Sequence, residues 1–166
     1  MREKLLSATA ASAMALLTVG APVAQADPDQ ACGPDQATAM ADAIAHTPHD
    51  TLTQAPWNPA PVGGSSFDSC ANLSAVVVSI DNPRPTSPRN AFLFHRGVFT
   101  GTALWQSRPY LTLDPKATTK DVVVLVAISG RTCGTCNDGA ASILHYRWDG
   151  ARPVMLDPMP PPQAWP

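Results

Sequence analysis

The stretch NLSAVVVSIDNPRPTSPRNAFLFHRGVFTGT, residues 72–102, is the most informative part of the chain. It contains two apolar runs, Leu73 to Ile80 and Ala91 to Phe94, separated by a connection rich in proline. Proline inside a helix removes a hydrogen-bond donor and clashes with the preceding turn, so the connection cannot be helical. The stretch therefore predicts a strand, a connection and a returning strand. Arg96-Gly97 then predicts a tight turn into a third strand, Val98 to Thr102.

Side chains in both runs alternate between two faces. In the first run both faces are apolar, with Val76, Val78 and Ile80 on one and Leu73, Ala75 and Val77 on the other. In the second run, Phe92 and Phe94 share one face, and Leu93 and His95 share the other. A strand with two apolar faces is covered on both sides, so we expect the first strand in the middle of a sheet.

An amphipathic helix is predicted ahead of these strands. Pro34 fits the first helical position, and Asp35 suits the positive end of the helix. Apolar residues then recur at positions i, i+3, i+4 and i+7, namely Ala37, Met40, Ala41 and Ile44. The helix should end near His46 or Thr47, because Pro48 disfavours helical geometry in the residue before it.

Further strands are predicted in the second half of the chain. Asp121 to Ser129 is strongly β-prone, and Ile143 to Trp148 alternates apolar with polar residues. Gly134-Thr135 and Asp138-Gly139 each offer a hairpin turn between them, so the two strands should form a long hairpin. Pro153 to Leu156 predicts a short edge strand.

Two irregular segments, residues 49–69 and 103–120, separate the predicted elements. Large aromatic side chains should anchor such loops in the core. The expected anchors are Trp57 and Phe67 in the first segment and Trp105 and Tyr110 in the second.

These elements together predict an α+β fold in which one N-terminal helix packs on a four- to five-stranded antiparallel meander sheet. A cystatin-like or NTF2-like wrap, with the helix cradled by a curved sheet, is the nearest architecture, and this analogy implies no function. We expect a single domain over residues 27–156 and a proline-rich C-terminal tail over residues 157–166.

Residues 1–26 have the features of a secretory signal peptide. Arg2 and Lys4 precede an apolar stretch, and Ala24-Gln25-Ala26 has the small-x-small form of a cleavage site. Retention as a membrane anchor is the alternative, but Ser, Thr, Gly and Pro dilute the stretch and no basic stop follows it. We therefore expect a secreted or extracytoplasmic protein of the cell envelope, with no transmembrane segment in its mature chain.

The charge of the chain is close to balanced. Lys and Arg number 11 and Asp and Glu 13, which gives a formal net charge of −2. Proteins that bind nucleic acid or anionic membrane surfaces through charge carry an excess of Lys and Arg, which this chain lacks. We therefore expect no nucleic-acid partner.

The four cysteines are Cys32, Cys70, Cys133 and Cys136. An exported chain meets an oxidising environment, so these residues predict two disulfides. Three pairings are possible. Proximity in sequence favours Cys133 with Cys136, which leaves Cys32 to pair with Cys70.

Cys133 and Cys136 also have the C-x-x-C spacing of thiol-disulfide oxidoreductases, whose reactive thiolate lies at a helix N-terminus. A turn and a strand follow here instead of a helix, which favours a structural disulfide. An extracytoplasmic redox protein that uses this pair is the alternative function. Zinc bound by both cysteines and His145 would lack a fourth ligand, so we expect no metal or other cofactor.

No catalytic residue can be identified from the sequence. His95 and His145 could share the non-core face of a sheet, each beside an arginine, Arg96 and Arg147, as an anion-binding patch or a base. No nucleophile or acid is fixed near them, which favours surface polar residues. Asp68 is likewise expected to accept hydrogen bonds from neighbouring backbone N–H groups.

Several segments carry a family resemblance: FDSC at 67–70, VVVSID at 76–81, SPRNAFLFHRGVFTGTA at 87–103, DVVV at 121–124, YRWDG at 146–150 and LDPMPPP at 156–162. They resemble the LppP/LprE lipoprotein family of mycobacterial-type cell envelopes. The resemblance implies an exported envelope protein without an assigned activity, so it carries over no functional residues.

The chain departs from the lipoprotein pattern at one position. A lipoprotein has a cysteine directly after its cleavage site, whereas Cys32 follows Asp29-Gln30-Ala31, with no apolar residue at the third position back. We therefore expect a soluble secreted form. The favoured function is a non-enzymatic domain that binds an envelope lipid, glycan or protein through a concave sheet face or through the proline-rich tail with Trp165.

Overall fold

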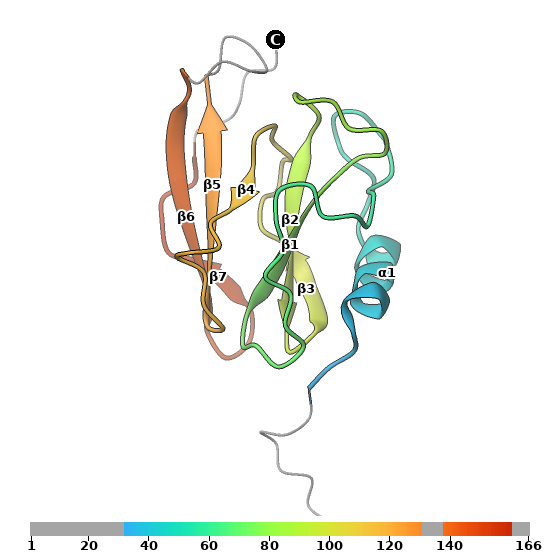
Figure 1. The fold of residues 1–166 in the computed structure, drawn as a ribbon, viewed down its shortest axis with the longest axis vertical. Helices are drawn as coiled ribbons and strands as arrows, with labels where there is room; N and C mark the ends of the chain where they lie inside the picture. The colour runs from blue at the N-terminus through green and yellow to red at the C-terminus, as the bar shows by residue number, and fades with distance from the viewer. Residues whose placement is uncertain (1–31, 131–137, 161–166) are drawn as a thin grey trace, which may run out of the picture. The chain divides into compact units, whose positions relative to one another are not determined.

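The computed structural model describes residues 32–130 and 138–160 (Figure 1). The elements in these ranges are α1 (Gln36–His46), β1 (Ser74–Ser79), β2 (Arg89–His95), β3 (Val98–Thr102), β4 (Thr112–Leu113), β5 (Val122–Ser129), β6 (Ala140–Trp148) and β7 (Pro153–Met155). The predicted signal peptide and the Gly134-Thr135 turn lie outside the described residues. Every predicted element is present within the described ranges, and β4 is an addition.

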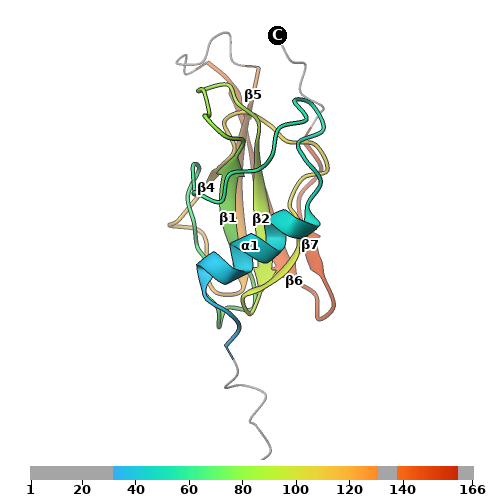
Figure 2. The same ribbon diagram turned by 90° about the vertical axis from the view of Figure 1, so that its right-hand side faces the viewer.

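The strands form two antiparallel sheets. One has the order β1-β2-β3 and the other the order β4-β5-β6-β7. Figure 1 shows the two sheets side by side, with α1 on the face of the three-stranded sheet that points away from the four-stranded sheet. Figure 2 shows α1 crossing β1 and β2. The layers are therefore helix, three-stranded sheet and four-stranded sheet, which confirms an α+β fold with a helix packed on a sheet.

This arrangement differs from the expected single sheet of four to five strands. The two sheets pack through a largely aliphatic core that includes Leu73, Val77 and Leu93 from one sheet and Leu125 and Leu144 from the other. Alternation along a strand shows that a face is buried but not whether a helix or a second sheet covers it. The strand pattern alone was therefore compatible with one sheet or two.

The opposite face of the three-stranded sheet packs against the helix. This second core is more aromatic and contains Ala39, Met40, Ala43, Trp57, Val76, Val78, Phe92 and Phe94. The rings of Phe92 and Trp57 meet edge to face with centroids 5.9 Å apart. The two faces predicted for β1 and β2 are thus both confirmed as buried faces.

β1 is an edge strand in this order, not the expected central strand. Residues 57–66 run along its free edge, where Val77 N donates to Gly64 O at 2.9 Å and Ser66 N donates to Ala75 O at 2.8 Å. All six residues of β1 are buried. The strand is apolar on both faces because a loop, instead of a further strand, closes its edge.

The β2–β3 hairpin has the tight turn expected at Arg96-Gly97. Both residues have positive φ, 47° at Arg96 and 74° at Gly97, as in the two-residue turns that match the twist of a hairpin. Gly33 packs directly against this turn, because a Cβ there would collide with the carbonyl oxygen of Arg96. The turn therefore touches the chain just before α1.

α1 ends where Pro48 predicts, but it begins at Gln36, two residues after the start expected at Pro34. Asp35 is the N-cap, and Thr38 N donates to its carboxylate at 2.9 Å. This hydrogen bond lowers the pKa of Asp35. At the other end, Thr47 leaves the helical conformation just before Pro48.

The loop anchors are confirmed for the first irregular segment, whereas in the second Tyr110 is half-buried and belongs to neither core. Trp57 is buried and Phe67 packs against the same cluster. Trp105, in contrast, is 71% exposed, while its neighbours Leu104 and Leu111 are buried between the sheets. The prediction that Trp105 anchors the second segment is therefore wrong, because the inter-sheet core is filled by leucines.

The first residues of the predicted C-terminal tail are bound to the domain. His145 Nδ1 donates to Asp157 at 2.9 Å, and Arg108 Nη2 donates to Pro160 O at 3.0 Å. Pro160 is buried. Residues 157–160 thus belong structurally to the domain. Of the helices in the described ranges, none is both long and apolar enough to cross a membrane.

Candidate functional site

Residues 68–73, here called the junction segment, connect the three layers at one end of the sheets. Gly33 N, ahead of α1, donates to Ser69 O at 2.8 Å. Arg96 N, at the end of β2, donates to Ala71 O at 2.9 Å. Leu73 N donates to the carbonyl oxygen of Lys120, just before β5, at 3.0 Å. The junction segment therefore bonds to the chain near the helix and near both sheets.

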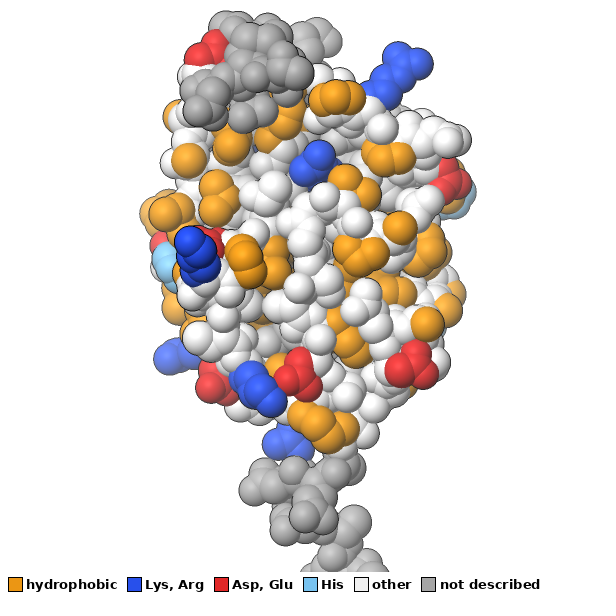
Figure 3. Space-filling model, in the orientation of Figure 1, with side chains coloured by type: hydrophobic (Ala, Val, Ile, Leu, Met, Phe, Trp, Pro, Cys, Tyr) orange, Lys and Arg blue, Asp and Glu red, His pale blue; other side chains and the backbone are white. Residues whose placement is uncertain are grey.

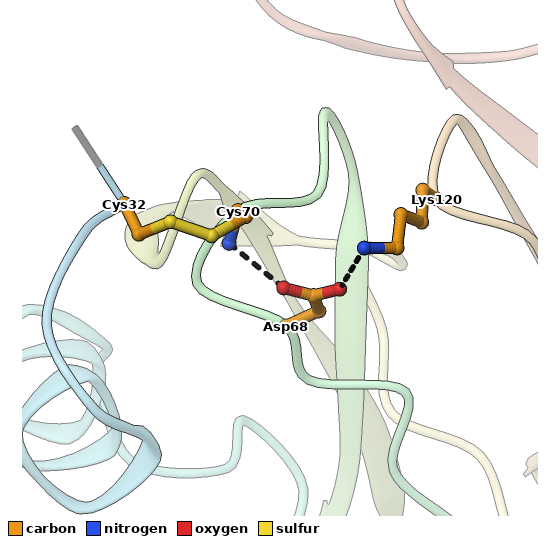
Figure 4. Close-up of a disulfide and its surroundings, with 4 residues drawn as sticks. All are labelled: Cys32, Asp68, Cys70 and Lys120. Atoms are coloured by element: carbon orange, nitrogen blue, oxygen red, sulfur yellow. Dashed lines mark hydrogen bonds and ion pairs between the residues drawn. A yellow bond between two sulfur atoms is a disulfide. The ribbon is translucent and has the colours of Figure 1, made fainter. Parts of the chain in front are cut away.

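A disulfide joins Cys32 to Cys70 in the junction segment, as expected, with Cα atoms 4.5 Å apart (Figure 4). It fixes the start of the helical layer to the segment that leads into β1. Cys133 and Cys136 lie outside the described residues. Their pairing, their redox role and their role as zinc ligands all remain predictions.

Asp68 holds the junction segment in place. Its carboxylate accepts from Cys70 N at 2.8 Å and pairs with Lys120 Nζ at 3.0 Å (Figure 4). The backbone hydrogen bond from Cys70, with help from Lys120, lowers the pKa of Asp68. The expected structural role of this residue agrees with the structure. A polar cleft of 330 Å³ with several Ser and Thr residues lies beside the ion pair.

The next residues of the junction form a second polar cluster. Asn72 Nδ2 donates to Asp121 Oδ1 at 2.5 Å, and His95 Nδ1 donates to Asn72 O at 2.6 Å. The His95 ring stacks on the indole of Trp148, with centroids 4.0 Å apart and planes 8° from parallel. A cleft of 370 Å³, here called the Trp148 cleft, is lined by Asn72, Asp121, Arg147 and Trp148.

A third feature is an apolar groove of 610 Å³ beside α1. Its lining residues are Gln36, Ala37, Met40, Ala41, Ile44, Pro59 and Ala60. The helical residues of this set recur every three or four positions, so they share one face of α1. Figure 3 shows hydrophobic side chains gathered on the side where α1 lies. Met40 is buried whereas Ala37 and Ala41 are exposed, which places Met40 deepest in the groove.

The two histidines considered as a patch lie on different faces of different sheets. His95 in β2 points between the sheets toward Trp148. His145 in β6 lies on the opposite side of its strand from the buried Leu144, and Asp157 accepts from its ring and from its backbone N–H. These hydrogen bonds, the backbone one first, lower the pKa of Asp157. The hypothesis of a shared histidine and arginine patch is therefore wrong.

A buried carboxylate, Asp50, accepts hydrogen bonds from its own loop and from the segment that contains Ser107. It accepts from Thr53 N and Thr53 Oγ1, each at 2.8 Å, and from Ser107 Oγ. Ser107 thus bonds directly to the carboxylate, with no imidazole between them, and the nearby His49 is exposed. This arrangement does not activate Ser107 as a nucleophile. Within residues 32–130 and 138–160, no three His, Cys, Asp or Glu residues are grouped as a metal site.

Comparison with known proteins adds the family. The model of the LppP/LprE lipoprotein family matches residues 65–151, which is more than half of the chain. The chain belongs to this family. The segment matched contains both sheets up to the turn after β6, together with the junction segment and the Trp148 cleft. Membership of a lipoprotein family indicates an envelope-associated location outside the cytoplasm.

Individual relatives agree with the family assignment. The chain is 30% identical over 134 residues to a protein described as lipoprotein LprE from Mycobacterium leprae. The aligned region covers 80% of this chain and 63% of that protein. It is 28% identical over 111 residues to LprE proteins of Mycobacterium tuberculosis and Mycobacterium bovis, covering 67% of this chain and 51% of each relative. The chain therefore spans less than two thirds of the length of these relatives. No solved structure matches it.

Sequence reasoning missed the groove and the Trp148 cleft for different reasons. The groove could have been found, because its helical residues were already recognised as the apolar face of α1. The cleft could not, since His95 and Trp148 are 53 positions apart in sequence and meet only when the two sheets pack.

Proposed function

We propose that the protein is an extracytoplasmic, envelope-associated binding domain without catalytic activity, and that it holds an acyl chain of an envelope lipid in the groove beside α1. The observation that carries this proposal is the lining of the groove, in which Gln36 is the one polar residue. Its volume of 610 Å³ is in the range of small-molecule sites.

The composition of the groove favours a slender aliphatic chain. Ala37, Ala41 and Ala60 have small side chains, so they leave an open groove instead of a closed pocket. Met40 lies at its deepest point, and an unbranched thioether side chain adapts its shape to a flexible ligand. No charged side chain lines the groove, so a charged headgroup would remain in water while the chain is buried.

The location of the protein supports this choice of ligand. Family membership indicates an envelope-associated protein, and lipid acyl chains are abundant in an envelope. A lipid-binding domain also needs no acid, base or nucleophile. This agrees with the direct bond between Asp50 and Ser107 and with the structural role of Asp68.

The proposal is tested with cis-parinaric acid, a fatty acid whose fluorescence rises in apolar surroundings, and with palmitate as a competitor. We expect the purified protein to enhance the fluorescence and palmitate to reverse it. Ala41→Glu should weaken binding at least tenfold, because the bound acyl chain would remove the new glutamate carboxylate from water. Both Ala41 and Glu are good helix formers, so α1 should persist.

Ala45→Glu is the matched control, because Ala45 is exposed on the same helix and does not line the groove. It should bind the probe as the unchanged protein does. An absence of any fluorescence change, or an equal loss in both variants, would show that the groove does not bind acyl chains.

A further inference from the structure

We propose that the Trp148 cleft is a second binding site, separate from the groove, and that its ligand is a neutral carbohydrate. Four side chains line the cleft, which has a volume of 370 Å³. They come from both sides of the packed sheets, since Asn72 precedes β1, Asp121 precedes β5, and Arg147 and Trp148 end β6. The site therefore exists only in the folded domain.

The aromatic ring of the cleft is held in a fixed orientation. Trp148 packs against the inter-sheet core and stacks on His95 from the opposite sheet. His95 is in turn fixed, because its Nδ1–H donates to Asn72 O at 2.6 Å. His95 covers one face of the indole, and the part of Trp148 that lines the cleft is an apolar surface that is already ordered, so a ligand meets it at little further cost in conformational entropy. The apolar C–H face of a sugar ring is a suitable partner for such a surface.

The polar groups of the cleft offer both donors and acceptors. Asn72 donates its amide N–H to Asp121 Oδ1 at 2.5 Å, which orients both side chains. This leaves the amide oxygen of Asn72 and the second carboxylate oxygen of Asp121 as acceptors facing solvent. Arg147, at an outer position of β6, also lines the cleft. Its guanidinium makes no ion pair or side-chain hydrogen bond among the residues that the structure describes, so its donors can bond to a ligand.

The charges of the cleft favour a neutral ligand. Arg147 and Asp121 contribute one positive and one negative side chain. An anionic ligand would meet the carboxylate, and a cationic ligand would meet the guanidinium. A hydroxyl group both donates and accepts, so adjacent hydroxyls can bond to Arg147 and Asp121 at the same time. A neutral polyhydroxylated ring satisfies all of these groups.

The cleft and the groove lie in different parts of the chain. The lining residues of the cleft are within residues 65–151, the part that matches the family, whereas the groove is formed by residues 36–60. Loss of one site therefore does not imply loss of the other. The carbohydrate proposal can be tested whether or not an acyl chain binds beside α1.

The test is a titration of the ¹⁵N-labelled protein with neutral tetrasaccharides of glucose, mannose, galactose and arabinose, and with tetragalacturonate as the acidic member of the panel. We expect at least one neutral sugar to shift the Trp148 indole N–H and the Asp121 amide signals. Arg147→Gln and Asp121→Asn should each weaken this binding by about tenfold or more, since hydrogen bonds to charged groups are among the strong ones. Both positions are exposed, so the variants should fold.

Arg84→Gln is the control, because it makes the same charge change at an exposed loop residue outside the cleft. It should bind as the unchanged protein does. The proposal is overturned if no neutral sugar binds, if tetragalacturonate alone binds, or if Arg147→Gln and Asp121→Asn leave the affinity unchanged.

Discussion

The two sheets differ in what lies on their outer faces. On the three-stranded sheet, Phe92 and Phe94 are completely buried under α1 and Trp57. On the four-stranded sheet, Val126 and Ile143 are paired across β5 and β6, and Ile143 is 55% exposed. In the described ranges, the helical layer covers the first sheet and not the second (Figure 1).

This difference is already visible in the residue types. The outer positions of β2 are phenylalanines, whose large apolar surface favours a covering layer. The outer positions of β6 include His145 and Arg147, whose charged or polar ends remain in water. Polar residues at alternate positions therefore mark the sheet that faces solvent, and aromatic residues mark the sheet that carries the helix.

The largest expected effect comes from removing an aromatic ring under the helix. Phe92→Ala should lower the free energy of unfolding by about 3–5 kcal/mol, because it leaves a cavity between Trp57 and Phe99. Val126→Ala on the outer face of β5 is the comparison and should cost less than about 1 kcal/mol, because the side chain is only half buried. Urea unfolding measures both, and equal losses would contradict the distinction between the sheets.

The disulfide is expected to contribute the next largest effect. Cys32→Ser combined with Cys70→Ser opens a link across 38 positions and should cost about 2–4 kcal/mol in the chain-entropy account. Because the link joins the start of the helical layer to the junction segment, hydrogen exchange should accelerate in α1 more than in β5. A thermal midpoint identical to that of the unchanged protein would argue against this role.

The smallest expected effect concerns the ion pair that connects the junction segment to β5. Because folding lowers the pKa of Asp68, its carboxylate takes up a proton in the unfolded chain at a higher pH than in the folded protein. The stability that this carboxylate contributes is therefore lost as the pH falls from about 5 to the folded-state pKa. Asp68→Asn should lower stability at pH 7 by less than about 1 kcal/mol, because Lys120 is largely exposed.

The same variant should also flatten the acid limb of the stability curve. Lys116→Gln, at an exposed lysine without an ion pair among the described residues, is the control and should leave the acid limb unchanged. If Asp68→Asn and the unchanged protein lose stability in parallel between pH 5 and pH 3, the carboxylate does not stabilise the junction.

Local patterns predicted the elements well, because each depends on near neighbours. Asp35 and Pro48 predicted the two ends of α1 to within a residue, although Pro34 lies before the helix and not at its first position. The alternation of Phe92 and Phe94 with Leu93 assigned both faces of β2. The Arg96-Gly97 turn followed from the preference of two-residue hairpins for positive φ.

The layer arrangement could not be predicted in the same way. The division into two sheets depends on contacts between distant residues such as Val77 and Leu125, which share the inter-sheet core. β4 has two residues, too short for any periodicity. Trp105 and Leu104 are adjacent, and only the packed structure shows which of them is buried. The site at Trp148 was out of reach for the same reason.

The loop that runs along β1 has a consequence for behaviour at high concentration. An unoccupied strand edge is a template on which another chain can add a strand and begin to aggregate. Residues 57–66 fill that position, where the carbonyl oxygen of Gly64 accepts a main-chain hydrogen bond from β1 and Ser66 N donates one to it. This edge of β1, all six of whose residues are buried, is thereby closed to strand pairing with another chain.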